Sequence, residues 1–130
     1  MTVFVDTSAL YALLSGDDPM HQRAAETFRS LGATDLVTHN YVVVECCALV
    51  HRRLGPSAAR DLVRDLLAPV DLVWIDEPIH RVASATFLSS GAAGPSLVDC
   101  ASFEVMRLRT IQTAFAFDRH FTDAGFDVLG

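Results

Sequence analysis

Short apolar runs alternate along the chain with longer stretches in which apolar residues recur every three or four positions. Runs that are rich in β-branched and aromatic residues predict buried strands at residues 3–5, 36–38, 72–75 and 111–117. The periodic stretches predict helices over residues 9–14, 17–32, 41–54, 57–67, 76–90 and 96–109. Residues 126–129 predict a further edge strand. This alternation favours an α/β fold in which helices cover both faces of a parallel sheet.

Glycine and proline residues separate these elements but do not divide the chain into domains. Only residues 91–95, Gly-Ala-Ala-Gly-Pro, have the composition of a flexible connection, and they are too few and too central for a domain linker. A chain of 130 residues buries roughly two thirds of its unfolded surface and needs no disulfide or metal to fold. We therefore expect residues 1–130 to form a single domain.

Two of the predicted strands are followed directly by an aspartate. Asp6 follows residues 3–5, and Asp118 follows residues 111–117. Ligands of open α/β sheets bind at the carboxyl ends of the strands, and adjacent strands would hold these two carboxylates side by side. A structural alternative for Asp6 is a helix N-cap that accepts hydrogen bonds from the backbone N–H groups of Ser8 and Ala9.

Two further acids lie on predicted helices and are expected to face inward. Glu45 has Val42 and Leu49 one turn away, so it is predicted to lie on the apolar stripe of its helix, out of reach of Arg52. Asp99 shares a helical face with apolar residues. It also stands three residues after Ser96, a spacing typical of a capping box, which is its structural alternative.

Clustered carboxylates would need a counter-charge. Two carboxylates ~4 Å apart at an effective dielectric constant of ~20 repel by ~4 kcal/mol, so three or four together take up protons or a cation. Oxygen ligands without Cys or His select Mg²⁺ or Mn²⁺ over zinc. Such a site suits phosphoryl transfer, because the metal orients the phosphate, lowers the pKa of a bound water and neutralises transition-state charge.

Composition narrows the classes of protein further. The net charge is −6 and argues against a generic nucleic-acid coat, although the four candidate acids account for most of the imbalance. Charges interrupt every apolar run before the ~18 residues of a membrane span, and no signal peptide is expected, which favours a cytoplasmic protein. Cys46, Cys47 and Cys100 are predicted to be reduced core thiols.

Four segments of the chain resemble the acidic motifs of PIN-domain ribonucleases, in particular of VapC-type toxins from bacterial toxin–antitoxin modules. These segments are VFVDTSAL with Asp6, NYVVVE with Glu45, PSLVDCASFEVMR with Asp99 and AFAFDRHF with Asp118. The resemblance implies a three-layer α/β/α sandwich around a parallel sheet, and RNA cleavage that depends on Mg²⁺ or Mn²⁺. It also implies that the four acids bind the metal, that the protein is a homodimer, and that a cognate antitoxin inhibits it.

The chain departs from the family pattern at two positions. Ala116 stands where relatives often have Thr or Ser, and His120 stands where some have a further acid, which leaves a second metal site open. His120 is also weighed as a proton donor and Arg119 as a phosphate contact. Thr7 and Ser8 have two alternatives, holding a metal-bound water or capping a helix.

The favoured function is therefore an endoribonuclease toxin in which Asp6 or Asp118 orients the attacking water. An aspartyl-phosphate phosphatase is disfavoured, because that chemistry requires a second acid two residues after the nucleophile, where Ser8 stands. The absence of Lys weakens a phospho-acceptor function. The remaining alternative is a catalytically inactive PIN-like module that binds RNA or protein.

Overall fold

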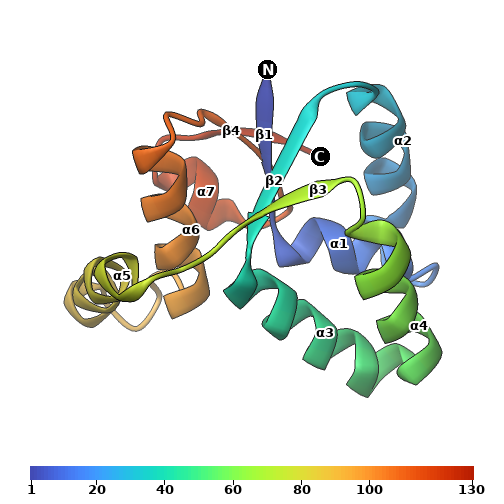
Figure 1. Cartoon of the computed structure of the whole chain (residues 1–130), viewed down its shortest axis with the longest axis horizontal. Helices are drawn as coiled ribbons and strands as arrows, with labels where there is room; N and C mark the ends of the chain where they lie inside the picture. Colours follow the sequence, from blue (N-terminus) through green and yellow to red (C-terminus); the bar gives the residue numbers. More distant parts are fainter.

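A parallel sheet of five strands forms the centre of the protein, whose computed structural model describes residues 1–130. In the sheet the strands lie in the order β3-β2-β1-β4-β5, and every neighbouring pair is parallel (Figure 1). The strands are β1 (Thr2–Val5), β2 (Asp35–His39), β3 (Val70–Val73), β4 (Thr113–Phe115) and β5 (Asp127–Leu129). The parallel sheet expected from the sequence is confirmed.

Helices cover the sheet on both sides, as Figure 1 shows. The first half of the chain supplies α1 to α4 on one side, and α6 and α7 lie on the other, with α5 packed against α6. The helices are α1 (Thr7–Leu14), α2 (His21–Leu31), α3 (Asn40–Leu54), α4 (Pro56–Asp61), η1 (Leu62–Leu66), α5 (Glu77–Ser89), α6 (Leu97–Leu108) and α7 (Arg119–Asp123). This is the three-layer α/β/α architecture that the sequence predicts.

The central strand β1 is the most deeply buried element. Val3 and Phe4 are fully buried and Val5 is 1% exposed, as expected for a strand covered by helices on both faces. Val5 pairs in register with Phe115 of β4, and the N–H of Asp6 donates to the carbonyl of Phe115 over 3.0 Å. The ends of β1 and β4 are therefore level, which brings the residues after them together.

Two predicted strands differ in extent. The third strand occupies Val70–Val73 instead of residues 72–75, because these residues match β2 in register and the N–H of Ile75 donates to the side chain of Asn40 instead. Trp74 consequently leaves the sheet and is 68% exposed. The predicted fourth strand, residues 111–117, shortens to Thr113–Phe115, since the N–H of Phe117 donates to the Ser8 hydroxyl.

Two further differences concern helix boundaries. The helix predicted over residues 57–67 is split into α4 and the π-helical segment η1. The helix predicted from residue 17 begins at His21, since the Asp18 side chain accepts from the N–H of Met20 in a turn that precedes it. No helix of the protein is long and apolar enough to span a membrane. All three cysteines are free thiols, with Cys47 only partly buried.

Candidate active site

The four predicted acids line one open cavity of about 800 Å³ at the carboxyl edge of the sheet. Asp6 follows β1, Glu45 lies on α3, Asp99 lies in the first turn of α6, and Asp118 precedes α7. Other lining residues are Thr7, Ser8, Leu49, Phe87, Leu88, Ser90, Gly91, Ala92, Gly94, Pro95, Ser96 and His120. The cavity thus combines four carboxylates with no Lys or Arg.

Asp6 caps α1 and lines the cavity at the same time. Its Oδ2 accepts from the Ser8 hydroxyl over 2.6 Å and from the Ser8 N–H over 3.2 Å, whereas Oδ1 accepts no hydrogen bond from the protein. Burial, with smaller contributions from the charges of Asp99 and Asp118, raises the pKa of Asp6 to about 7. A carboxyl group with this raised pKa binds a proton or a cation readily near neutral pH.

Asp99 also combines the two alternatives considered from the sequence. The capping box is present: the Asp99 N–H donates to the Ser96 hydroxyl, and Asp99 Oδ2 accepts from the Ser96 N–H, each over 3.1 Å. Asp99 nevertheless lines the cavity and is only 7% exposed. Burial, followed by the charge of Asp118, raises its pKa. The cap therefore orients a carboxylate that faces the other acids.

His120 links Asp118 to the glycine-containing loop at residues 91–95. Its Nδ1 lies 2.8 Å from Asp118 Oδ1, and its Nε2 lies 3.1 Å from the carbonyl oxygen of Ala93. A carbonyl only accepts hydrogen bonds, and an ionised carboxylate does likewise, so both contacts are made when both ring nitrogens carry protons. The hydrogen bond to Ala93, followed by the bond to Asp118, raises the pKa of His120.

Glu45 differs from the expectation, because it is exposed and does not lie in the apolar interior. The buried face of α3 is formed by Val42, Cys46 and Val50, and Glu45 lies beside that face, at the cavity. Its Oε1 accepts a hydrogen bond of 2.7 Å from the Thr7 hydroxyl. Its partner is thus a neutral hydroxyl group of α1 and not an arginine.

Ser8 holds two of the motifs together, a role that the sequence does not reveal. Its hydroxyl donates to Asp6 and accepts from the N–H of Phe117 over 2.9 Å, joining segments 109 residues apart. Ala116 is almost fully buried. Arg119 is exposed and does not line the cavity, which fits a solvated surface arginine better than the phosphate contact considered for it.

The side chains at the cavity fit a hard divalent cation. Asp99, Asp118 and His120 each offer one ligand atom, and these atoms all lie within 4.8 Å of one another. Carboxylate oxygens suit Mg²⁺ and Mn²⁺, whereas a ring nitrogen of His120 can act as a ligand only after it loses its proton and its hydrogen bond to Asp118 or Ala93. Asp6 and Glu45 lie outside this compact group although they line the same cavity. His120 is not among the ligands predicted from the sequence, and the signals for it are its spacing two residues after Asp118 and its position where some members of the resembled family have a further acid.

The sequence and the fold of the protein are similar to those of known proteins. The PIN domain family model matches residues 3–127. The sequence is 34% identical over 125 residues to the 23S rRNA-specific endonuclease VapC20 of Mycobacterium tuberculosis, covering 95% of both proteins.

Solved structures resemble the protein over nearly its whole length. The crystal structure of M. tuberculosis VapC20, described as a sarcin-ricin loop cleaving toxin, has a TM-score of 0.87 at 33% identity and covers 95% of each chain. FitAcB from Neisseria gonorrhoeae has a TM-score of 0.74 at 16% identity, covering 100% of this chain and 97% of the other, which shows the fold alone. The protein belongs to the PIN-domain family and, within it, to the VapC-type proteins.

Proposed function

We propose that the protein is a metal-dependent endoribonuclease that acts as the toxin of a toxin–antitoxin module. The observation that carries this proposal is the convergence of Asp6, Glu45, Asp99 and Asp118 on one cavity without a Lys or Arg. The likeness to VapC20, named a 23S rRNA-specific endonuclease, supports RNA as the substrate and makes ribosomal RNA the first to test. The alternative of an inert binding module is disfavoured because all four acids are present and line that cavity.

In this proposal, Asp99 and Asp118 hold a Mg²⁺ or Mn²⁺ ion, with Asp6, Glu45 and His120 completing or orienting the ligand set. When bound, the ion supplies Lewis acidity and lowers the pKa of a coordinated water. Thr7 holds Glu45, Ser96 holds Asp99 and Ser8 holds Asp6, so three hydroxyl-bearing residues keep three of the four acids in place.

Asp6 is proposed to accept a proton from the attacking water. Burial raises the pKa of Asp6 to about 7 in the metal-free protein, and a cation bound nearby would favour its ionised form, which is the form that accepts a proton. Ser8 occupies Oδ2, so Oδ1 is the oxygen left for the water. As the water oxygen bonds to phosphorus, the P–O bond to the leaving ribose oxygen breaks, that oxygen takes up a proton from solvent, and the RNA strand becomes two products with a phosphate end and a hydroxyl end.

The proposed assembly is a homodimer that a cognate antitoxin inhibits. Support comes from the resemblance to VapC-type toxins and from large apolar side chains that this chain leaves uncovered. Val44 and Trp74 are each 68% exposed, and Leu72 is 41% exposed. Apolar surface of this kind often marks a contact between subunits.

The direct test is cleavage of RNA by the purified protein. We expect cleavage with Mg²⁺ or Mn²⁺, none in EDTA, and none by Asp6→Asn with either metal. Asp35→Asn is the matched control, because Asp35 is an exposed acid at the start of β2, away from the cavity. Cleavage by Asp6→Asn at the wild-type rate, in a preparation free of other nucleases, would remove Asp6 from the mechanism. Absence of cleavage with both metals would favour the inert binding module.

A further inference from the structure

A second, smaller depression continues the acidic cavity along α1 and α3. Its volume is about 210 Å³, and it shares Ser8 and Leu49 with the cavity. Its other lining residues are Tyr11, Asp18, Met20, Arg53 and Phe117. We call this depression the α1–α3 groove. Because two residues line both spaces, an extended ligand at the acids can run into the groove.

The groove, unlike the cavity, offers a positive charge to an anionic ligand. A nucleic-acid strand is a polyanion, and the cavity itself offers four carboxylates. Arg53 is the only Lys or Arg that lines either space. No carboxylate oxygen lies within 4.0 Å of its guanidinium, and the nearby Asp18 carboxylate accepts from the N–H of Met20. The positive charge of Arg53 is therefore free to pair with a phosphate.

Helix α3 and its contact with α1 determine where the Arg53 side chain lies relative to the acids. Glu45, Leu49 and Arg53 are spaced four residues apart and follow one face of α3, so Arg53 lies ~12 Å beyond Glu45 along the helix. Its guanidinium carbon lies 5.6 Å from the ring centroid of Tyr11 on α1, within the range of a cation–π contact. The pair Thr7–Glu45 thus joins α1 and α3 at the cavity, and the pair Tyr11–Arg53 joins them at the groove.

We propose that Arg53 binds a backbone phosphate of the RNA, on a nucleotide away from the cleaved bond, and that Tyr11 is the positioning residue for its guanidinium. This inference rests on the proposed function and names a contact that extends it. Backbone positions 45 and 53 are ~12 Å apart along the helix, whereas one nucleotide of a helical strand rises ~3.4 Å. Arg53 also lines the groove and not the cavity with the acids, so the phosphate it meets is a flanking one.

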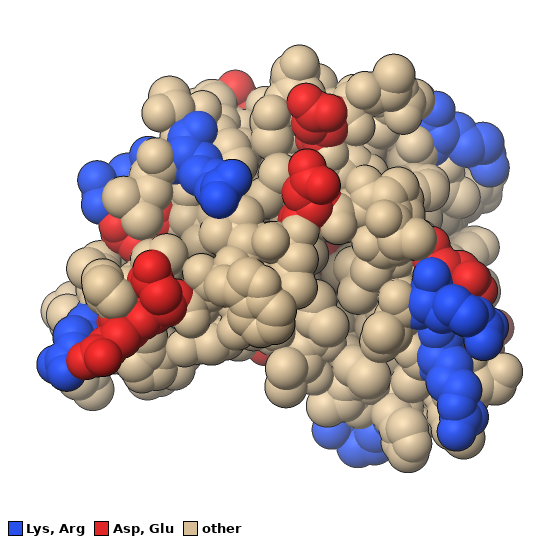
Figure 2. Space-filling model, viewed as in Figure 1, with Lys and Arg blue, Asp and Glu red and all other residues tan.

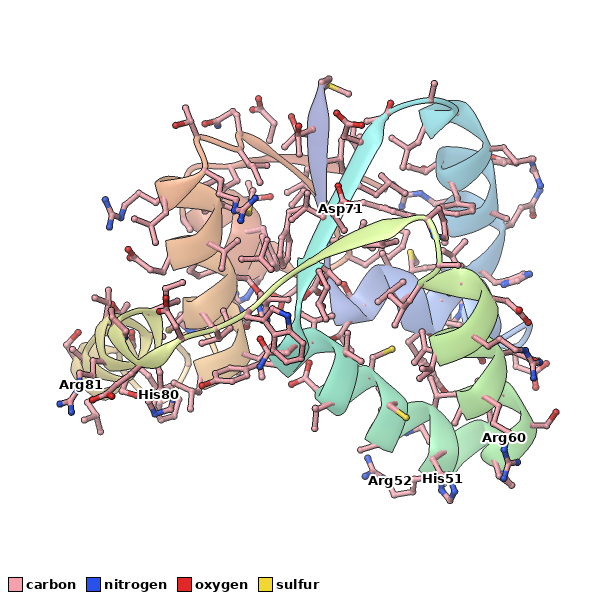
Figure 3. The ribbon with its side chains drawn as sticks, viewed as in Figure 1. His51, Arg52, Arg60, Asp71, His80 and Arg81 are labelled. Carbon is pink, nitrogen blue, oxygen red and sulfur yellow. The ribbon has the colours of Figure 1, made fainter.

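A structural explanation for Arg53 exists and has to be separated from this one. Basic side chains in the last turn of a helix interact favourably with its dipole, and His51, Arg52 and Arg53 all stand there in α3. Figure 2 shows basic side chains gathered over α4 and the end of α3, and Figure 3 shows Arg52 and Arg60 pointing outward there. Arg52 shares the helix end with Arg53 but lines neither space, so it is the matched control.

Binding is measured first, without cleavage. Fluorescence anisotropy of a short labelled single-stranded RNA in EDTA gives the dissociation constant at several salt concentrations. We expect Arg53→Gln to weaken binding about tenfold and to flatten the slope of log K against log salt by ~0.7, the value for one lost phosphate contact on a single strand. Arg52→Gln should stay within about twofold of the wild type with an unchanged slope.

Cleavage kinetics with Mn²⁺ then separate a flanking contact from a catalytic one. Arg53→Gln should raise KM about tenfold and leave kcat within about twofold, because the lost contact is equal in the ground and transition states. Tyr11→Leu should also raise KM, whereas Tyr11→Phe, which keeps the aromatic ring, should have the KM of the wild type. Melting temperatures of all variants confirm that each is folded.

The outcomes distinguish this inference from the function on which it rests. If the wild type cleaves RNA while Arg53→Gln and Arg52→Gln match each other in KM and salt slope, Arg53 serves the helix end only and the inference is wrong. The same conclusion follows if Arg53→Gln loses affinity for an antitoxin protein but not for RNA. If the wild type cleaves no RNA but binds it in an Arg53-dependent way, the contact of Arg53 with RNA is supported and the proposed nuclease function is wrong.

Discussion

Replacing Asp6 by Asn should change how the stability of the metal-free protein depends on pH. The pKa of Asp6 is raised from 3.8 to about 7, chiefly by burial. Between these two values the unfolded chain carries an ionised Asp6 while the folded protein keeps the proton. The unfolded state then binds fewer protons, so the free energy of unfolding falls as pH rises, and it levels off above the folded pKa. Asn has no such ionisation.

The magnitude follows from the difference between the folded and unfolded pKa of Asp6. A tenfold change in an ionisation constant corresponds to ~1.36 kcal/mol, so the full contribution of Asp6 is ~4 kcal/mol and the part that develops between pH 5 and pH 8 is ~3 kcal/mol. The unfolding free energy of Asp6→Asn minus that of the wild type should therefore increase by ~3 kcal/mol across this range. Groups that both proteins share, such as His39, cancel in the difference.

The assay is urea unfolding followed by far-UV circular dichroism, at pH 5, 6, 7 and 8 in EDTA. Saturating Mg²⁺ should stabilise the wild type most at pH 8, where Asp6 is ionised. It should therefore reduce much of the difference in unfolding free energy between Asp6→Asn and the wild type. Asp35→Asn, whose carboxylate is exposed, should run parallel to the wild type at every pH. Parallel curves for Asp6→Asn as well would refute the reasoning, because they would mean that folding does not perturb the ionisation of Asp6.

Three further predictions concern Asp99, His39 and the apolar surface. In thermal scans, Asp99→Asn should keep or raise the melting point in EDTA but lose much of the stabilisation by metal. For the wild type this stabilisation is ~2.7 kcal/mol when the metal is present at a hundred times its dissociation constant. Ser96→Ala should lower the free energy of unfolding by ~1 kcal/mol and keep the stabilisation by metal. Burial lowers the pKa of His39 to about 3, so stability should fall as pH drops from about 6.5 towards 3 and His39→Gln should show a shallower loss, measured by acid unfolding. Static light scattering at micromolar concentration should report a dimer that Trp74→Ser weakens; a wild-type monomer would contradict the proposed assembly.

The parts of the fold and site that the sequence predicts are those with local signals. Residues 3–5 form a buried strand because every side chain is apolar, and the following Asp6 reaches the sheet edge for that reason alone. The sequence predicts a parallel sheet but not which strands are neighbours, and the pairing of β1 with β4 is what brings Asp6 and Asp118 to one cavity. The sequence indicates both features of Asp99, because its spacing from Ser96 predicts the capping box and its helical face predicts burial.

The parts that the sequence does not predict depend on contacts between distant segments. The Thr7 hydroxyl meets Glu45 across 38 residues, and His120 meets the Ala93 carbonyl across 27, with no periodic pattern to mark either pair. The interior position expected for Glu45 is wrong because helical spacing alone does not tell which edge of an apolar stripe borders a cavity. The third strand differs from its predicted range because register with β2, and not local strand propensity, determines its ends.

The exposed position of Trp74 also gives the protein a built-in optical reporter. It is the only tryptophan of the chain, and its indole is 68% exposed in the isolated subunit. Its emission should therefore change little when an isolated subunit unfolds, since water surrounds the ring in both states. Covering the ring by another protein surface should shift the emission to shorter wavelength. Intrinsic fluorescence will thus follow association, while a backbone signal such as circular dichroism is needed to follow folding.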